Sequence, residues 1–247
     1  MTPEIVAYVI AGAMAGGLIN GLAGFGTALF ALGFFLIVMP PLQAVAIVVV
    51  LSVVTGLQGL WVVRRAITAQ PARLARFLLP ALVGIPLGVA LLGMIEARTL
   101  KLVIAGMLLL YGGYFSMRAR LPRFERPTPV LDILVGFAGG ILGGAAALSG
   151  ALPMMWCALR PWPKHETRAV LQPFNVVVLA VTTVLLALKG AYTRETLIYL
   201  AVALPASLLA AQIGIAVFRR LTDAAFRRLM IVMTFVSGAV LLLRELF

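Results

Sequence analysis

The feature that most constrains this chain is its first apolar run, residues 5–39, which contains no charged side chain. As one continuous helix this run would be about 50 Å long, whereas the hydrocarbon layer of a membrane is about 30 Å thick. With 63% hydrophobic and 11% charged residues, the 247-residue chain is too apolar to bury its surface as a soluble domain. The sequence predicts an all-α polytopic membrane protein whose first apolar run is broken in the middle.

A glycine-rich stretch at residues 16–27 interrupts this run and is echoed 123 residues later at 139–150. Glycine weakens a helix in a membrane and commonly marks close helix packing or a break that exposes backbone groups. At the same offset Ser52 falls on Asn175. We interpret the pattern as an internal duplication, with chance similarity between apolar helices as the alternative. Three alanines at 145–147 dilute the second copy, so its backbone is expected to pack more like an ordinary helix.

The duplication divides the chain into three parts. We expect a first transmembrane repeat at 1–117, a cytoplasmic linker rich in Arg and Pro at 118–129, and a second transmembrane repeat at 130–247. Each repeat carries four apolar segments, or five if its first segment is two pieces joined at the glycines. The expected total is therefore about 8–10 transmembrane segments.

The distribution of positive charge favours five segments per repeat. With four, the 20 Lys and Arg residues divide almost evenly between the two faces; with five, they divide 15 to 5, the minority being Arg98, Lys101, Lys189, Arg194 and Arg244. A strong bias toward one face is what the positive-inside rule requires. An odd number of segments also makes the two repeats inverted, with broken or re-entrant first helices and both termini periplasmic. The charge count does not distinguish a full crossing from a re-entrant hairpin.

The expected ligand is a small anion. A helix broken within the membrane presents free N–H groups and the positive end of its dipole, which can hold a carboxylate or sulfonate without a buried cation. The candidate substrate-binding residues carry backbone, hydroxyl, amide or guanidinium groups near the two breaks: Asn20, Gly24, Gly26, Thr27, Ser52, Ser149, Gly150, Arg168, Gln172 and Asn175. Asn20 would orient the turn or donate its amide to the substrate, and Arg168 would pair with the anion. The alternatives are close packing for the glycines, interhelical hydrogen bonds for the polar residues, and an interfacial anchor for Arg168.

Several functions are disfavoured by what the segments lack. All eight Asp and Glu residues lie near segment ends or in loops, and the chain has one cysteine, Cys157, and one histidine, His165. A metal site needs clustered ligands, and a thiol relay needs a second cysteine. The net charge of +12 is distributed in short clusters between apolar runs, which argues against nucleic acid as a partner. We expect a non-enzyme with no catalytic residues, metal or cofactor, whose partners are a small anionic substrate and the lipid bilayer.

Several of these elements together resemble the sulfite exporter TauE/SafE family, also called TSUP permeases. They are NGLAGFG at 20–26, the small-residue segments at 80–88 and 205–214, and SGALP at 149–153 followed by RPWPK at 160–164 and by Arg168. The resemblance covers nearly the whole chain. It implies transport of small sulfur-containing anions or organic acids, such as sulfite, sulfoacetate or related sulfonates, across the bacterial inner membrane. With the inverted halves expected above, we expect a secondary transporter that works by alternating access. An anion channel and, less closely, a membrane assembly factor are the alternatives, and the sequence is compatible with a homodimer.

Overall fold

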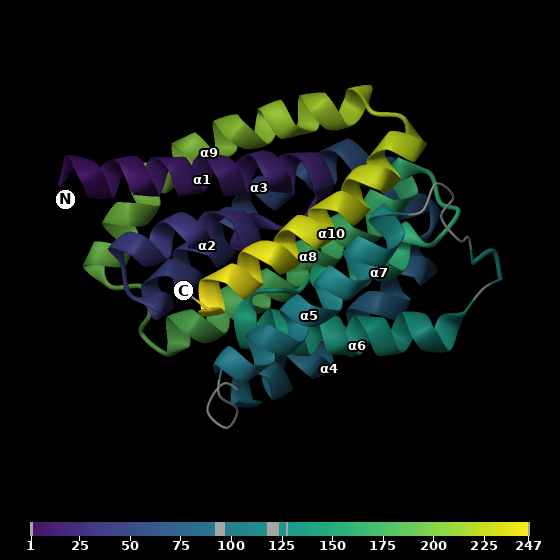
Figure 1. Cartoon of the computed structure of the whole chain (residues 1–247), viewed down its shortest axis with the longest axis horizontal. Coiled ribbons are helices and arrows are strands. Elements are labelled where there is room, and N and C mark those ends of the chain that lie inside the picture. The colour runs from purple at the N-terminus through teal and green to yellow at the C-terminus, as the bar shows by residue number, and fades with distance from the viewer. Residues whose placement is uncertain (1, 92–96, 118–123, 127, 247) are drawn as a thin grey trace.

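The computed structural model describes residues 2–91, 97–117, 124–126 and 128–246, and every secondary-structure element in these ranges is an α-helix (Figure 1). Much of the expected linker, residues 118–123 and 127, lies outside the described residues. The helices are α1 (Pro3–Ala23), α2 (Thr27–Val38), α3 (Pro41–Ala69), α4 (Pro71–Leu91), α5 (Ala97–Ser116), α6 (Pro129–Ala146), α7 (Ala151–Ala158), α8 (Lys164–Leu188), α9 (Arg194–Arg220) and α10 (Asp223–Leu246).

Five of the described helices are long and apolar enough to cross a membrane by length and composition: α1, α3, α4, α8 and α9. Helices α2 and α6 are apolar but shorter. Proline opens α1, α3, α4 and α6, where its missing N–H costs no hydrogen bond. The structure therefore confirms the all-helical class and several membrane-spanning candidates.

The break predicted in the first apolar run is present. Helix α1 ends at Gly24, whose φ of 89° is left-handed and whose N–H donates to the Asn20 carbonyl at 2.8 Å. Gly26, with φ of 93°, then precedes the first residue of α2, Thr27. Only glycine adopts both conformations without steric strain, so the local sequence itself dictates the break.

The second glycine block is also broken, as five segments per repeat predicts, so the expectation that its backbone would pack more like an ordinary helix is wrong. Helix α6 ends and α7 begins on either side of residues 147–150, and Ala147 is left-handed with φ of 55°. Two hydrogen bonds hold this turn, from the Ala147 N–H to the Gly143 carbonyl (3.1 Å) and from the Leu148 N–H to the Leu142 carbonyl (3.2 Å). They offset the strain of about 1–2 kcal/mol that a Cβ adds in this conformation.

The principal helix pairs join the two halves of the chain. Helix α1 packs along α9, α4 along α6, α3 against α8, and α5 against α10. If α1–α5 are exchanged with α6–α10 in order, the same helix pairs are obtained. The pair of α1 with α9, for example, becomes the pair of α6 with α4. Figure 1 shows α1 and α6 beginning at opposite ends of the molecule, and α10 running back into the half in which α1 begins.

Glycines at equivalent positions lie at the contacts of α1 with α9 and of α6 with α4. A Cβ added at Gly17 of α1 would overlap the Ser207 carbonyl oxygen of α9, and one at Gly140 of α6 would overlap the Ala81 carbonyl oxygen of α4. Gly17 and Gly140 are 123 residues apart, whereas Ala81 and Ser207 are 126 apart. Close backbone approach at matched positions therefore fixes both pairs in the same way.

Candidate anion-binding pocket

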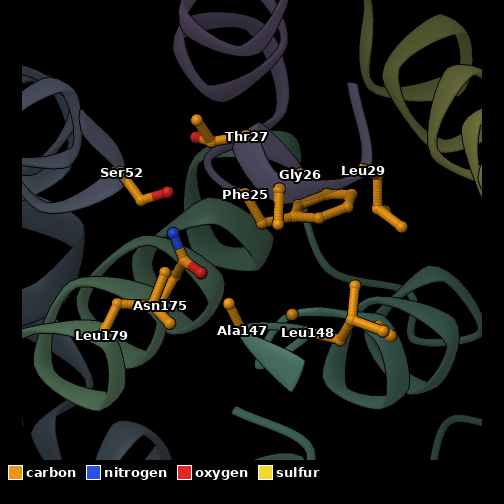
Figure 2. Close-up of a pocket in the computed structure, with 12 residues that line it drawn as sticks. Phe25, Gly26, Thr27, Leu29, Ser52, Ala147, Leu148, Asn175 and Leu179 are labelled. Carbon is orange, nitrogen blue, oxygen red and sulfur yellow. The ribbon is translucent and has the colours of Figure 1, made fainter. Parts of the chain in front are cut away.

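A small pocket lies where the two helix breaks meet the middle of α3 and α8 (Figure 2). Its walls are Phe25, Gly26, Thr27, Ala28, Leu29, Ser52, Ala147, Leu148, Gly150, Ala151, Asn175 and Leu179. Asn175 is the twelfth of the 25 residues of α8, so the pocket is at about half the depth of that helix. None of these lining residues is charged.

Three polar atoms in the pocket wall have no hydrogen-bond partner among the described residues: Thr27 Oγ1, Ser52 Oγ and Asn175 Nδ2. Their residues are 1%, 1% and 3% exposed. A buried polar group without a partner costs about 1–3 kcal/mol, so such groups normally mark a site that something else completes. All three atoms can donate a hydrogen bond, a chemistry that suits an anion.

The N-terminus of α2 adds backbone donors to the same pocket. Its first three residues, Thr27, Ala28 and Leu29, all line the pocket, and Gly26 before them provides no side-chain cap. The first N–H groups of a helix have no partner within the helix and lie at the positive end of its dipole. A Cβ at Gly150, which precedes α7, would lie 2.7 Å from Phe25 Cβ, so the two breaks can meet only with glycine there.

Two of the predicted residues support the pocket rather than line it. Ser149 is fully buried, and its hydroxyl donates to Asn175 Oδ1 at 2.7 Å, which fixes the orientation of the Asn175 amide. The Asn20 amide donates to the Ser52 carbonyl at 3.0 Å and to Thr55 Oγ1 at 2.7 Å. Because both amide protons are used in this way, Asn20 ties α1 to α3, and its predicted alternative role as a donor to substrate is not supported.

The remaining three predicted residues form a separate buried group. Arg168 Nε donates to Gln172 Oε1 at 3.0 Å, and both residues are fully buried. A Cβ at Gly24 would lie 2.9 Å from Gln172 Oε1, which places the end of α1 over this pair. The structure therefore divides the ten predicted residues between the pocket, its supports and this second group, which we call the Arg168 group. The Arg168 side chain is not exposed at all, which does not fit the alternative role of an interfacial anchor.

Eight of the twelve lining residues form four pairs that are each 123 residues apart: Phe25 with Leu148, Thr27 with Gly150, Ala28 with Ala151, and Ser52 with Asn175. The apolar members were not predicted as site residues. The same offset that revealed the duplication would have found them, since they flank both glycine-rich breaks.

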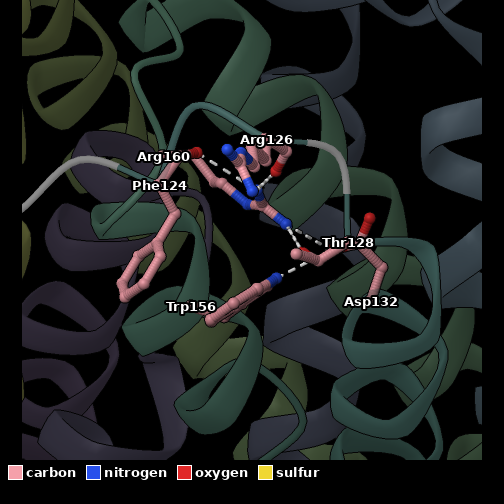
Figure 3. A network of polar contacts seen from close by, with 6 residues as sticks. All are labelled: Phe124, Arg126, Thr128, Asp132, Trp156 and Arg160. Carbon is pink, nitrogen blue, oxygen red and sulfur yellow. Dashed lines mark hydrogen bonds and ion pairs between the residues drawn. The ribbon is translucent and has the colours of Figure 1, made fainter.

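A network of polar contacts holds the start of α6 against the end of α7 (Figure 3). The buried Arg160 donates to the carbonyl oxygens of Phe124 and Arg126, to the Thr128 hydroxyl, and to Asp132 Oδ1 at 3.1 Å. Trp156 Nε1 donates to the same carboxylate oxygen at 2.7 Å.

Two more basic side chains from the majority group of the charge count, Arg73 and Lys164, lie at the same end of the molecule as this network. The Arg73 guanidinium pairs with Glu166 and lies 4.2 Å from the centre of the Trp162 ring. The Lys164 ammonium donates to the Phe218 carbonyl at 3.0 Å at the end of α9. We call this end of the molecule, where α7 and α9 finish and α8 begins, the basic end.

Comparison with known families identifies the chain. No curated protein and no solved structure matches this chain. The sequence model described as "Sulfite exporter TauE/SafE" matches residues 8–241, nearly the whole chain. The chain therefore belongs to the sulfite exporter TauE/SafE family.

Proposed function

We propose that this protein is a secondary transporter that binds a small sulfur oxyanion or sulfonate, such as sulfite or sulfoacetate, in the pocket between the two helix breaks. The observation that carries the proposal is the convergence of three buried, unpartnered donor groups, on Thr27, Ser52 and Asn175, at the N-terminus of α2. Membership of a transporter family and several apolar spanning helices support a multi-pass membrane protein.

The pocket chemistry favours an anion over a cation or a neutral solute. Hydroxyl and amide protons and helix N–H groups all direct positive partial charge at the ligand. No described residue of the lining is an acid that would stabilise a cation. A sulfonate or sulfite group has three oxygens that accept hydrogen bonds, enough to use all three side-chain donors at once.

Inverted repeats are the simplest account of the helix pairing. The exchange of equivalent pairs, the matched glycine contacts, and the four residue pairs around the pocket all support an approximate two-fold axis through the pocket. Inverted repeats meeting at a mid-membrane site allow one half to rock against the other, so that the site opens to each side in turn. The basic end is then cytoplasmic, and both termini are periplasmic.

The size of the pocket is compatible with a carrier that opens to bind its substrate. The space it encloses is about that of one water molecule, too small for sulfoacetate. Helices must therefore separate for a substrate to bind, as alternating access requires. A channel would conduct far faster than a carrier turns over, so counterflow of labelled sulfoacetate together with saturable flux in proteoliposomes would support the carrier.

The experiment that tests the function uses purified protein and proteoliposomes. Ser52→Ala and Asn175→Ala should each weaken binding of sulfite or sulfoacetate, measured as a smaller rise in thermal midpoint, and should slow uptake. The variants must insert and purify like the parent protein. Wild-type protein that neither binds nor transports these anions, or variants that transport them normally, would contradict the proposal.

A further inference from the structure

The Arg168 guanidinium is buried with two of its three nitrogens unused. Arg168 is 0% exposed, and neither Nη1 nor Nη2 has a hydrogen-bond partner in the part of the chain that the structure describes. Its Nε donates to Gln172, and its guanidinium carbon lies 4.4 Å from the centre of the Phe218 ring. The described ion pairs join Arg73 to Glu166 and Arg160 to Asp132, so neither neutralises this charge.

Arg160 shows how this protein satisfies a buried arginine for structural purposes. Its two terminal nitrogens donate to two carbonyl oxygens, a hydroxyl and a carboxylate. Arg168, eight residues further along the chain, has no such acceptors at its terminal nitrogens. An isolated buried charge costs several kcal/mol, so a guanidinium in this state is suited to bind an anion that is not part of the protein. The Gln172 amide nitrogen, also buried and unpartnered, lies beside it.

The position of this group relates it to the pocket. Arg168 precedes Asn175 by seven residues on α8, two helical turns or about 10 Å toward the basic end. On α3, Gly59 follows Ser52 by the same seven residues, and a Cβ at Gly59 would lie 2.9 Å from Arg168 Nη2. Helix α8 therefore carries a pocket residue and, two turns away, Arg168, and α3 carries a pocket residue and, two turns away, the glycine that Arg168 packs against. Glycine at position 59 makes room for the guanidinium between them.

We propose that Arg168 and Gln172 form a second anion station, about 10 Å from the pocket on the side of the basic end. It takes a sulfonate, sulfite or carboxylate group, which the guanidinium binds through two parallel N–H bonds while the Gln172 amide nitrogen donates a third. In this structure the Arg168 Nε already donates to Gln172 Oε1, so the two Nη nitrogens are the ones left for the anion. An anion arriving from the basic end is held there first and then moves along the α3–α8 interface to Ser52 and Asn175. This inference rests on the proposed function.

Replacement of Arg168 by cysteine gives a side-specific test. In a Cys157→Ala background, Arg168→Cys should lower sulfoacetate uptake at subsaturating concentration by about tenfold or more, because the loss of even one of the two charge-assisted hydrogen bonds would have about a tenfold effect. A membrane-impermeant thiol reagent should label the new cysteine in inside-out vesicles but not in right-side-out vesicles, and sulfoacetate should slow the labelling. Aminoethyl modification, which restores a positive charge, should recover uptake, and ethylsulfonate modification should not.

Thr182→Cys in the same background is the matched control. It lies seven residues beyond Asn175 on α8 and is also buried, but on the side away from the basic end. It should not be labelled from the basic end. Arg168→Gln, which keeps a polar side chain without the charge, provides the same uptake measurement without chemical modification.

The outcomes separate this inference from the proposed function. Arg168→Gln and Arg168→Cys variants that take up sulfoacetate like the parent, or labelling that sulfoacetate does not slow, would overturn the second station while leaving the pocket intact. Failure of the parent protein to transport sulfoacetate or sulfite would instead overturn the proposed function. Reduced uptake with side-specific, sulfoacetate-protected labelling is the result expected if both are correct.

Discussion

The hydrogen bond from Ser149 to Asn175 allows a sharp test of how the pocket is organised. At 2.7 Å between two residues that are 0% and 3% exposed, it holds the Asn175 amide with Nδ2 toward the pocket. Ser149→Ala removes this neutral bond, which is worth about 0.5–1.5 kcal/mol, so the Kd for sulfoacetate should rise about 2- to 12-fold. Asn175→Ala removes a donor to the anion itself, worth about 1.5–3 kcal/mol, so the Kd should rise about 10- to 150-fold.

The double variant tests whether Ser149 acts through Asn175. If Ser149 acts through Asn175, then Ser149→Ala/Asn175→Ala should bind no more weakly than Asn175→Ala alone, because the hydroxyl has nothing left to orient. The Kd is obtained from the rise in thermal midpoint with sulfoacetate concentration in detergent. Thr182→Val is the matched control, since its buried hydroxyl donates only to the Val178 carbonyl of its own helix at 2.9 Å. Additive effects, or a larger effect for Ser149→Ala than for Asn175→Ala, would refute this reasoning.

Three further predictions concern packing and topology. Gly17→Ala should lower the thermal midpoint, because its Cβ would overlap the Ser207 carbonyl and such overpacking costs about 1–3 kcal/mol, whereas Gly33→Ala, which meets no atom within 4 Å, should not. Asp132→Ala should destabilise the protein by about 3–5 kcal/mol, because it leaves the buried Arg160 without its carboxylate; equal thermal midpoints would contradict this. A fluorescent reporter that matures only in the cytoplasm should stay dark at the C-terminus, and a bright one would reject the five-segment topology.

Local backbone requirements could be predicted from sequence with the most success. Gly24 and Gly26 both adopt left-handed φ, and the excess length of residues 5–39 had already required a break there. Five segments per repeat also predicted a break in the second glycine block, although the alanines at 145–147 suggested a more ordinary helix there. In the structure Ala147 adopts the left-handed conformation, held by hydrogen bonds from its own N–H and that of Leu148 rather than by glycine. Alanine content indicates helix propensity, but it does not reveal a turn that hydrogen bonds stabilise.

The candidate residues were predicted as a single site, and packing divided them. Gly26, Thr27, Ser52, Gly150 and Asn175 line the pocket. Sequence spacing places Arg168 and Asn175 on the same face of α8. It does not show which part of that face packs against the two helix breaks, so it could not separate the pocket residues from the Arg168 group.

The sequence by itself determined the membrane class, the family, the first break and the 123-residue spacing of the two glycine blocks, because these depend on apolar length, glycine and repeated pattern along one chain. Only the tertiary structure decided that α3 meets α8 across the halves, that Ser52 and Asn175 line one pocket, and that Arg168 is buried without an ion pair to any described acid. The physical reason is that the rotation and crossing of each helix are fixed by backbone contacts with a distant partner, such as Gly17 on Ser207, which no local pattern specifies.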